Sequence, residues 1–94
     1  MKAKDRIAEL VRLVEGDPAS IDKDYNGSWR YRETHGELDI IITDSDSYDC
    51  PWVDIYHFQA GPVALYRVTD NAKAAKLIEE YKEDFGVRKA PVSN

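Results

Sequence analysis

The fold is decided by the stretch from Trp52 to Val68, which reads WVDIYHFQAGPVALYRV. Aromatic and β-branched residues alternate on both sides of Ala60-Gly61-Pro62, a pattern typical of two strands joined by a tight turn. A two-residue turn at Ala60-Gly61 or at Gly61-Pro62 divides the side chains between the two faces in the same way, because strand side chains alternate with a period of two. A three-residue loop would change that division.

Both faces of this predicted hairpin are largely apolar. A sheet with one face in water normally alternates cleanly between apolar and polar residues, so we expect each face of this hairpin to be covered. One face carries Trp52, Asp54, Tyr56, Phe58, Val63, Leu65 and Arg67, and the other carries Val53, Ile55, His57, Ala64, Tyr66 and Val68.

Chain length and composition are those of one ordinary globular domain, which we assign to residues 1–94. The sequence has 94 residues, of which 43% are hydrophobic and 33% are charged. Its longest apolar runs span a few residues, far short of the roughly 20 that a membrane-spanning helix needs. Cys50 is the one cysteine, which excludes an internal disulfide and indicates the cytoplasm.

Helices are predicted near both ends of the chain. Apolar residues recur every three or four positions over residues 4–15 and again over residues 71–85, which is the spacing of amphipathic helices. Gly16 is expected to end the first helix in the left-handed conformation that follows many helices. Residues 17–27 are expected to be a connector with at most a short extended piece at residues 21–25, and residues 87–94 a frayed tail.

A second hairpin is predicted over residues 28–43. His35-Gly36 is its expected two-residue turn. This register places Tyr31 opposite Ile40 on an apolar face, and Arg32 opposite Asp39 on a polar face. Residues 44–51 are expected to form a loop, since aspartate, serine and proline predominate in them. This loop leads into the hairpin at residues 52–68, called here the central hairpin.

The predicted order is helix, four strands, helix, which indicates a two-layer α+β domain with a four-stranded antiparallel sheet. Two helices with one apolar stripe each cover only one face of such a sheet. The face of the 52–68 hairpin that carries Trp52 could point toward the helices or away from them. A pair between Asp54 and Arg67 on this face favours pointing it outward, and its apolar bulk favours pointing it inward; we expect it to point outward. We therefore predict that at least two of four large apolar residues contact a partner or a second copy of the chain. The four are Trp52, Tyr56, Phe58 and Leu65.

Negative charge is concentrated in the middle of the chain, which has a formal net charge of -5. No Lys or Arg occurs between Glu33 and Tyr66. This stretch is typical of charges that protect sheet edges and loops, and it also predicts a surface that steers a basic partner. Its acidic residues are Glu33, Glu37, Asp39, Asp44, Asp46, Asp49 and Asp54.

These features favour a small, acidic, cytoplasmic protein-binding module. One alternative is a nucleic-acid-mimicking inhibitor, since small phage and plasmid proteins that place carboxylates where phosphates would lie are similar to this chain in size and acidity. A second alternative is a small enzyme that uses His57 as an acid or base with a neighbouring carboxylate. The residues expected to contact a partner are Trp52, Tyr56, Phe58, Leu65, Glu37, Asp39, Asp44, Asp46, Asp49 and Asp54.

Direct nucleic-acid binding, metal binding and cofactor binding are not expected. The pI is about 4.9, and the basic residues are scattered rather than clustered. Asp44, Asp46 and Asp49 lie in a loop without the sixth-position glycine and closing glutamate of an EF-hand. No set of residues supplies a nucleophile, a base and an oxyanion donor together, so no catalytic residues are assigned.

Overall fold

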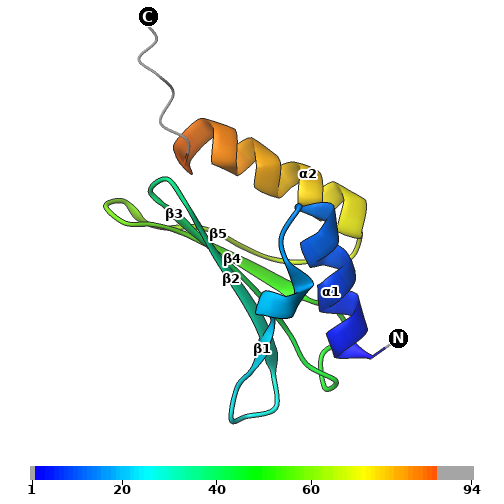
Figure 1. The fold of residues 1–94 in the computed structure, drawn as a ribbon. Helices are drawn as coiled ribbons and strands as arrows, with labels where there is room; N and C mark the ends of the chain where they lie inside the picture. Colours follow the sequence, from blue (N-terminus) through cyan, green and yellow to red (C-terminus); the bar gives the residue numbers. More distant parts are fainter. Residues whose placement is uncertain (1, 87–94) are drawn as a thin grey trace, which may run out of the picture.

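The computed structural model describes residues 2–86, which form two helices on one side of an antiparallel sheet (Figure 1). The predicted α+β class is confirmed, and the predicted tail lies outside the described residues. No helix in residues 2–86 has the length and apolar content to cross a bilayer. The helical segments are α1 (Ala3–Leu13), the 3-10 turn η1 (Pro18–Ser20), α2 (Asn71–Tyr81) and the π-helical η2 (Lys82–Gly86). The strands are β1 (Asp22–Lys23), β2 (Trp29–His35), β3 (Leu38–Asp44), β4 (Trp52–His57) and β5 (Gly61–Arg67).

The sheet has five strands rather than the predicted four, and their order in space is their order in the chain. The extra strand, β1, pairs with the start of β2. A tight turn brings the chain back: the Asp24 carboxylate accepts hydrogen bonds from the backbone N–H groups of Asn26 and Ser28 at 2.9 and 3.0 Å, and Gly27 has a φ of 88°. Two residues are too few for an alternation of side chains to be recognised in sequence.

The first hairpin turns one residue later than predicted, at Gly36-Glu37. Arg32 therefore lies opposite Ile41, and its guanidinium still reaches Asp39 diagonally at 2.8 Å. The predicted division between an apolar and a polar face survives, because moving a two-residue turn by one residue leaves each side chain on its original face.

The central hairpin turns through three residues, 58–60, where a two-residue turn was predicted. That loop alone would exchange the two faces of one strand. A β-bulge prevents this: Ile55 pairs with Ala64 and Tyr56 pairs with Pro62, which leaves Val63 as the extra residue. The division of faces is restored beyond the bulge. Val63, predicted to face outward, packs against the core instead.

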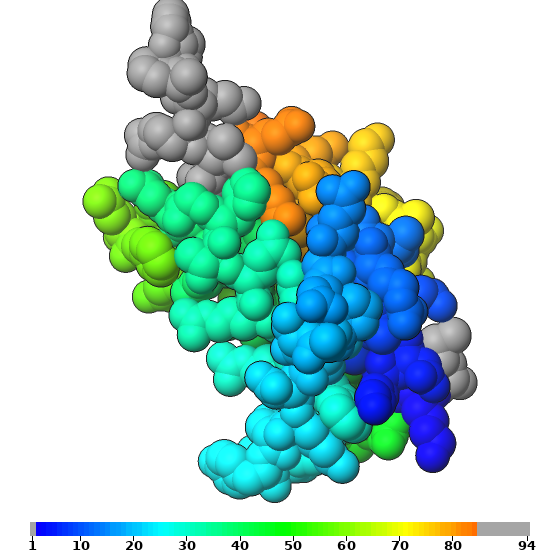
Figure 2. Space-filling view, in the orientation of Figure 1, coloured from blue at the N-terminus to red at the C-terminus, as the bar shows by residue number. Residues whose placement is uncertain are grey.

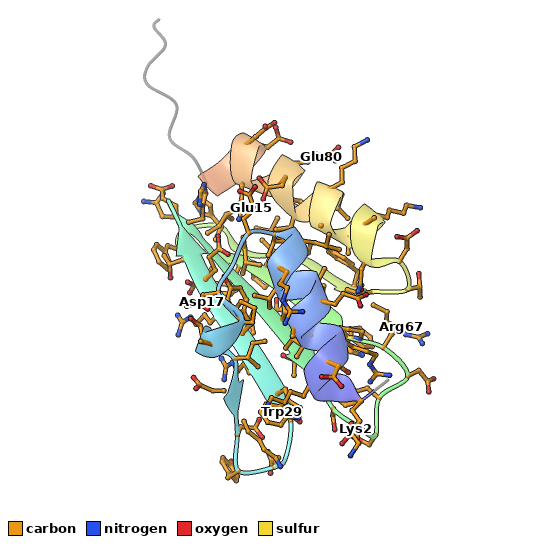
Figure 3. The ribbon with its side chains drawn as sticks, turned by 45° about the vertical axis from the view of Figure 1, so that its right-hand side comes forward. Lys2, Glu15, Asp17, Trp29, Arg67 and Glu80 are labelled. Atoms are coloured by element: carbon orange, nitrogen blue, oxygen red, sulfur yellow. The ribbon has the colours of Figure 1, made fainter. Side chains whose placement is uncertain are left out.

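The core lies between the two helices and one face of the sheet, as the side chains in Figure 3 show. The predicted helical stripes supply one side of it, and alternate residues of the strands supply the other. Its buried members are Ile7, Leu10, Val11, Val14, Tyr31, Leu38, Ile40, Ile42, Val53, Ile55, Val68, Ala74, Ala75 and Ile78.

The end of α1 depends on Gly16 for a different reason from the predicted one. Glu15 adopts the left-handed conformation, with a φ of 63°, and Gly16 provides space. A Cβ atom at Gly16 would collide with the hydroxyl of Tyr31. Burial, together with a 2.8 Å hydrogen bond donated to Glu33, raises the pKa of the Tyr31 hydroxyl.

The end of α2 is fixed to the sheet by a buried lysine. Regular helix ends at Tyr81 rather than at Phe85, and a π-helical turn follows; the side chain of Phe85 lies outside the described part. Lys82 is 6% exposed, and its ammonium lies 2.7 Å from the Glu33 carboxylate and 3.4 Å from that of Glu79. A buried lysine needs such partners to remain charged.

Matched substitutions in the central hairpin should separate its buried face from its exposed face. Ile55→Ala removes a side chain that is 0% exposed and should lower the free energy of unfolding by about 2–5 kcal/mol. Leu65→Ala, at 66% exposure, should change it by no more than about 0.5 kcal/mol. Urea denaturation measures both, and equal losses would contradict the assignment of faces.

Candidate functional site

The face of the sheet opposite the helices, called here the open face, carries four large apolar side chains. Trp52 and Tyr56 come from β4, Phe58 from the loop after it, and Leu65 from β5; their exposed fractions are 36%, 43%, 57% and 66%. We call these four residues the apolar patch. Both helices lie on the other side of the sheet (Figure 1), so the predicted outward orientation is confirmed.

The apolar patch results from strict alternation along β4. Val53 and Ile55 point into the core and are 0% exposed, so the residues between and beside them must point the other way. The tip of the β4–β5 hairpin, in light green, projects beside the β2–β3 turn at the left of the space-filling view (Figure 2). Phe58 belongs to that tip, and its backbone N–H donates to the carbonyl of Glu37 at 3.1 Å.

Asp54 lies at the centre of the open face. It pairs with Ile41 of β3 on one side and with Leu65 of β5 on the other, while Trp52 and Tyr56 lie two residues before and after it on the same face of β4. Its carboxylate makes no hydrogen bond or ion pair within residues 2–86. An unpaired, half-buried carboxylate thus has apolar residues directly opposite it and aromatic residues before and after it along β4.

A shallow hollow of about 370 Å³ lies beside Asp54. Some residues of its wall were not predicted as site residues. Ile41 could have been recognised from the sequence as a site residue, because it is an apolar residue on the face of β3 that was predicted to be polar. Tyr48 could not, because it belongs to a loop without regular spacing. The hollow is lined by Asp24, Arg30, Ile41, Thr43, Tyr48, Trp52, Asp54 and Leu65.

Arginine side chains lie toward the rim of the open face. Arg32 forms a 2.8 Å ion pair with Asp39, whose carboxylate also accepts a 2.8 Å hydrogen bond from Thr34. Arg67 does not form the expected pair with Asp54, and its guanidinium lies 3.9 Å from the Asp49 carboxylate instead. Both arginines therefore have carboxylate partners of their own.

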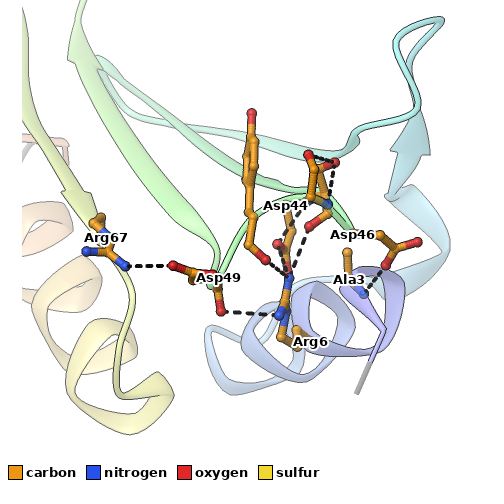
Figure 4. Close-up of polar contacts among 9 residues, drawn as sticks. Ala3, Arg6, Asp44, Asp46, Asp49 and Arg67 are labelled. Carbon is orange, nitrogen blue, oxygen red and sulfur yellow. Dashed lines mark hydrogen bonds and ion pairs between the residues drawn. The ribbon is translucent and has the colours of Figure 1, made fainter.

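The acidic loop is organised from within by Arg6 of α1 (Figure 4). The guanidinium of Arg6 donates two hydrogen bonds to the Asp44 carboxylate, at 2.8 and 2.9 Å, and three more to the backbone carbonyls of Ser45, Tyr48 and Asp49, at 3.1 to 3.2 Å. The side chain of Asp44 is 0% exposed. The hydrogen bond to Asp44 raises the pKa of Arg6. Asp44 is therefore an internal anchor of the loop.

The remaining acidic residues predicted to contact a partner have different surroundings. Asp46 accepts a 2.9 Å hydrogen bond from the backbone N–H of Ala3, which satisfies a donor at the start of α1. Glu37 lies 3.0 Å from the Nε2 atom of His57. Asp49 has a side chain that is 94% exposed. The structure does not gather these carboxylates into one patch, and no group of three metal-binding side chains is found in residues 2–86.

His57 holds the loop of the central hairpin. Its Nδ1 atom accepts hydrogen bonds from the backbone N–H groups of Gln59 and Ala60, both at 3.1 Å, and its Nε2 atom faces Glu37 at 3.0 Å. Both ring nitrogens are thus occupied by neighbouring protein groups. This arrangement explains the histidine as a structural residue of the turn.

A larger hollow, of about 570 Å³, lies between α1 and the start of α2. Its polar side chains are largely engaged with one another or with the loop: Asn71 donates to Glu9 at 2.9 Å, and Arg6 is bound by Asp44. Cys50 also lines this hollow. The open face, where a charged group is left without a partner, is therefore the stronger candidate site.

Comparison with protein-family models, with curated protein sequences and with solved structures finds no match for this chain. The functional argument therefore depends on the geometry described above.

Removing Arg6 should destabilise the protein strongly. Arg6→Met leaves the buried carboxylate of Asp44 without its counter-charge, and we expect a loss of about 3–5 kcal/mol in the free energy of unfolding. Arg12→Met in the same helix removes an exposed arginine and should cost no more than about 0.5 kcal/mol. Chemical denaturation at neutral pH compares the two, and equal stabilities would show that Asp44 does not need this partner.

The Arg32–Asp39 pair should make stability depend on pH. Hydrogen bonds from Arg32 and then from Thr34 lower the pKa of Asp39. A carboxylate with a lowered pKa stabilises the fold above its ordinary pKa of about 3.9, and this stabilisation is lost as the pH falls through the lowered value.

Asp39→Asn should therefore be less stable than the wild type at pH 7, and the difference should narrow toward pH 2. Asp54→Asn is the matched control, because Asp54 has no partner in residues 2–86, and it should show no such difference. Urea denaturation across this pH range provides the measurement. A constant gap between Asp39→Asn and the wild type would rule out the assigned role of the pair.

Proposed function

We propose that this protein is a cytoplasmic, non-enzymatic protein-binding module that docks a partner on its open face. The observation that carries the proposal is the exposure of the apolar patch, 36–66% for each side chain, on a face that both helices leave uncovered. Exposed apolar side chains that cluster on a soluble protein usually mark an interaction site. Aromatic residues are also the residues that most often dominate binding energy at protein interfaces.

The composition of the open face fits a protein interface. Such interfaces have an apolar, aromatic centre and a polar rim. Here the apolar patch forms the centre, and the paired arginines Arg32 and Arg67 lie toward the rim with half-exposed side chains, at 57% and 53%. Cys50, the single cysteine, is consistent with a reducing compartment.

The alternatives receive less support from the geometry. Carboxylates that replace phosphates have to be exposed and unpaired, whereas Asp39 and Asp44 are buried and bound to arginines. An enzyme that uses His57 as a base needs a free ring nitrogen, and both nitrogens of His57 are engaged.

Site-specific photo-cross-linking tests the proposal. A photo-reactive amino acid at position 58 or 65 of the open face should form cross-links to a partner in extracts of the native cells. The same residue at position 80 should form no such cross-link. Glu80 is also accessible to solvent, but it belongs to α2, which lies on the other side of the sheet from the open face (Figure 3). Leu65→Asp, at a position that is 66% exposed, should abolish cross-linking from position 58 without unfolding the protein.

The products are analysed by mass spectrometry, and sedimentation of the purified protein reports whether it self-associates. A cross-linked product of two identical chains would identify the partner as a second copy. Equal cross-linking from positions 58, 65 and 80, or none from the open face, would contradict the proposed function.

A further inference from the structure

We infer that the partner presents a lysine or arginine side chain, set among apolar residues, to Asp54 at the centre of the open face. This inference rests on the proposed function and specifies the chemistry of the partner.

The position of Asp54 makes its carboxylate part of any contact that covers the apolar patch. Ile41 and Leu65 lie on either side of it across the sheet, and Trp52 and Tyr56 lie before and after it along β4. A partner that covers these side chains also removes water from Asp54. Burying a carboxylate without a compensating charge is strongly unfavourable, so a purely apolar partner would bind poorly, and a partner with a cation would recover the lost hydration.

The protein's own cations do not fill this role. Arg32 is paired with Asp39 and Arg67 with Asp49. Arg30 lines the same hollow as Asp54, but no ion pair joins these two side chains within residues 2–86. Asp54 lies directly opposite two uncharged residues, Ile41 of β3 and Leu65 of β5.

The surroundings of Asp54 suit a cationic side chain in particular. Lysine ammonium and arginine guanidinium groups are attracted to the faces of tryptophan and tyrosine rings, and both kinds of ring flank Asp54 along β4. The long aliphatic stems of lysine and arginine pack well on apolar surfaces. The hollow of about 370 Å³ beside Asp54 leaves room for the end of one such side chain.

A second copy of this chain fits the same surface less well. A two-fold symmetric contact places the same patch of both copies against each other. Centred on the apolar patch, that contact would bring two unpaired Asp54 carboxylates into one apolar interface, where like charges repel strongly.

Parallel selections from a phage-displayed library of random 12-residue peptides test the inference. The wild type and Asp54→Asn are the two targets, and Glu80→Gln is the control, because it removes the same charge from an exposed position of α2, on the other side of the sheet (Figure 3). Asp54→Asn should keep the urea midpoint of the wild type, since Asp54 has no partner in residues 2–86. The peptides selected on the wild type are then synthesised and their Kd values measured for all three proteins by titration at 50 and 500 mM salt.

The expected peptides carry lysine or arginine between large apolar residues. Their Kd should rise about tenfold or more for Asp54→Asn and stay within about twofold for Glu80→Gln. Salt should weaken their binding to the wild type more than to Asp54→Asn. Three outcomes would overturn the inference: selected peptides without a basic residue, equal Kd values for the wild type and Asp54→Asn, or no selection above that obtained with Leu65→Asp. Concentration-dependent dimerisation that Leu65→Asp abolishes would also overturn it, in favour of a second copy. In each case the cross-linking result decides separately whether the open face binds a protein at all.

Discussion

The structure depends on a mismatch between the sheet and the helices that cover it. Strand β4 carries large apolar side chains on both faces, whereas α1 and α2 both pack on one side of the sheet (Figure 1). The buried side is satisfied by Val53 and Ile55, which are 0% exposed. The other side has no equivalent cover in the described part of the chain, so the apolar patch faces water. The proposed function follows from this imbalance more than from any charged feature.

Several acidic residues make contacts within the fold. Arg6 fastens the loop after β3 to α1 through Asp44, and Asp46 accepts a hydrogen bond from the first turn of the same helix. Much of the negative charge in the middle of the chain is therefore part of the fold. Asp54 differs because it has no partner within residues 2–86 and lies directly opposite Ile41 and Leu65. A single unpaired carboxylate in this position carries more information about a partner than a count of acidic residues does.

The sequence predicted side-chain direction better than turn position. Trp52 and Tyr56 were correctly placed outward although both hairpin turns were wrong, because direction depends only on parity, and the bulge at Val63 restores parity after a three-residue loop. Turn position was harder to predict because Gly36 and Gly61, with φ values of 62° and 87°, fit several turn types. The Arg6–Asp44 pair joins residues 38 positions apart, so no local pattern indicates it.

Alternation along β4 also separates substitutions that change the exposed surface from substitutions that change the core. Adjacent positions of this strand point to opposite sides, so a substitution at Trp52 or Tyr56 alters what the molecule touches and leaves the interior beneath it as it was. Variation at these positions can therefore change the exposed surface one residue at a time, without a compensating change at Val53 or Ile55. Under the proposed function, the strand would allow recognition to change while the architecture is retained.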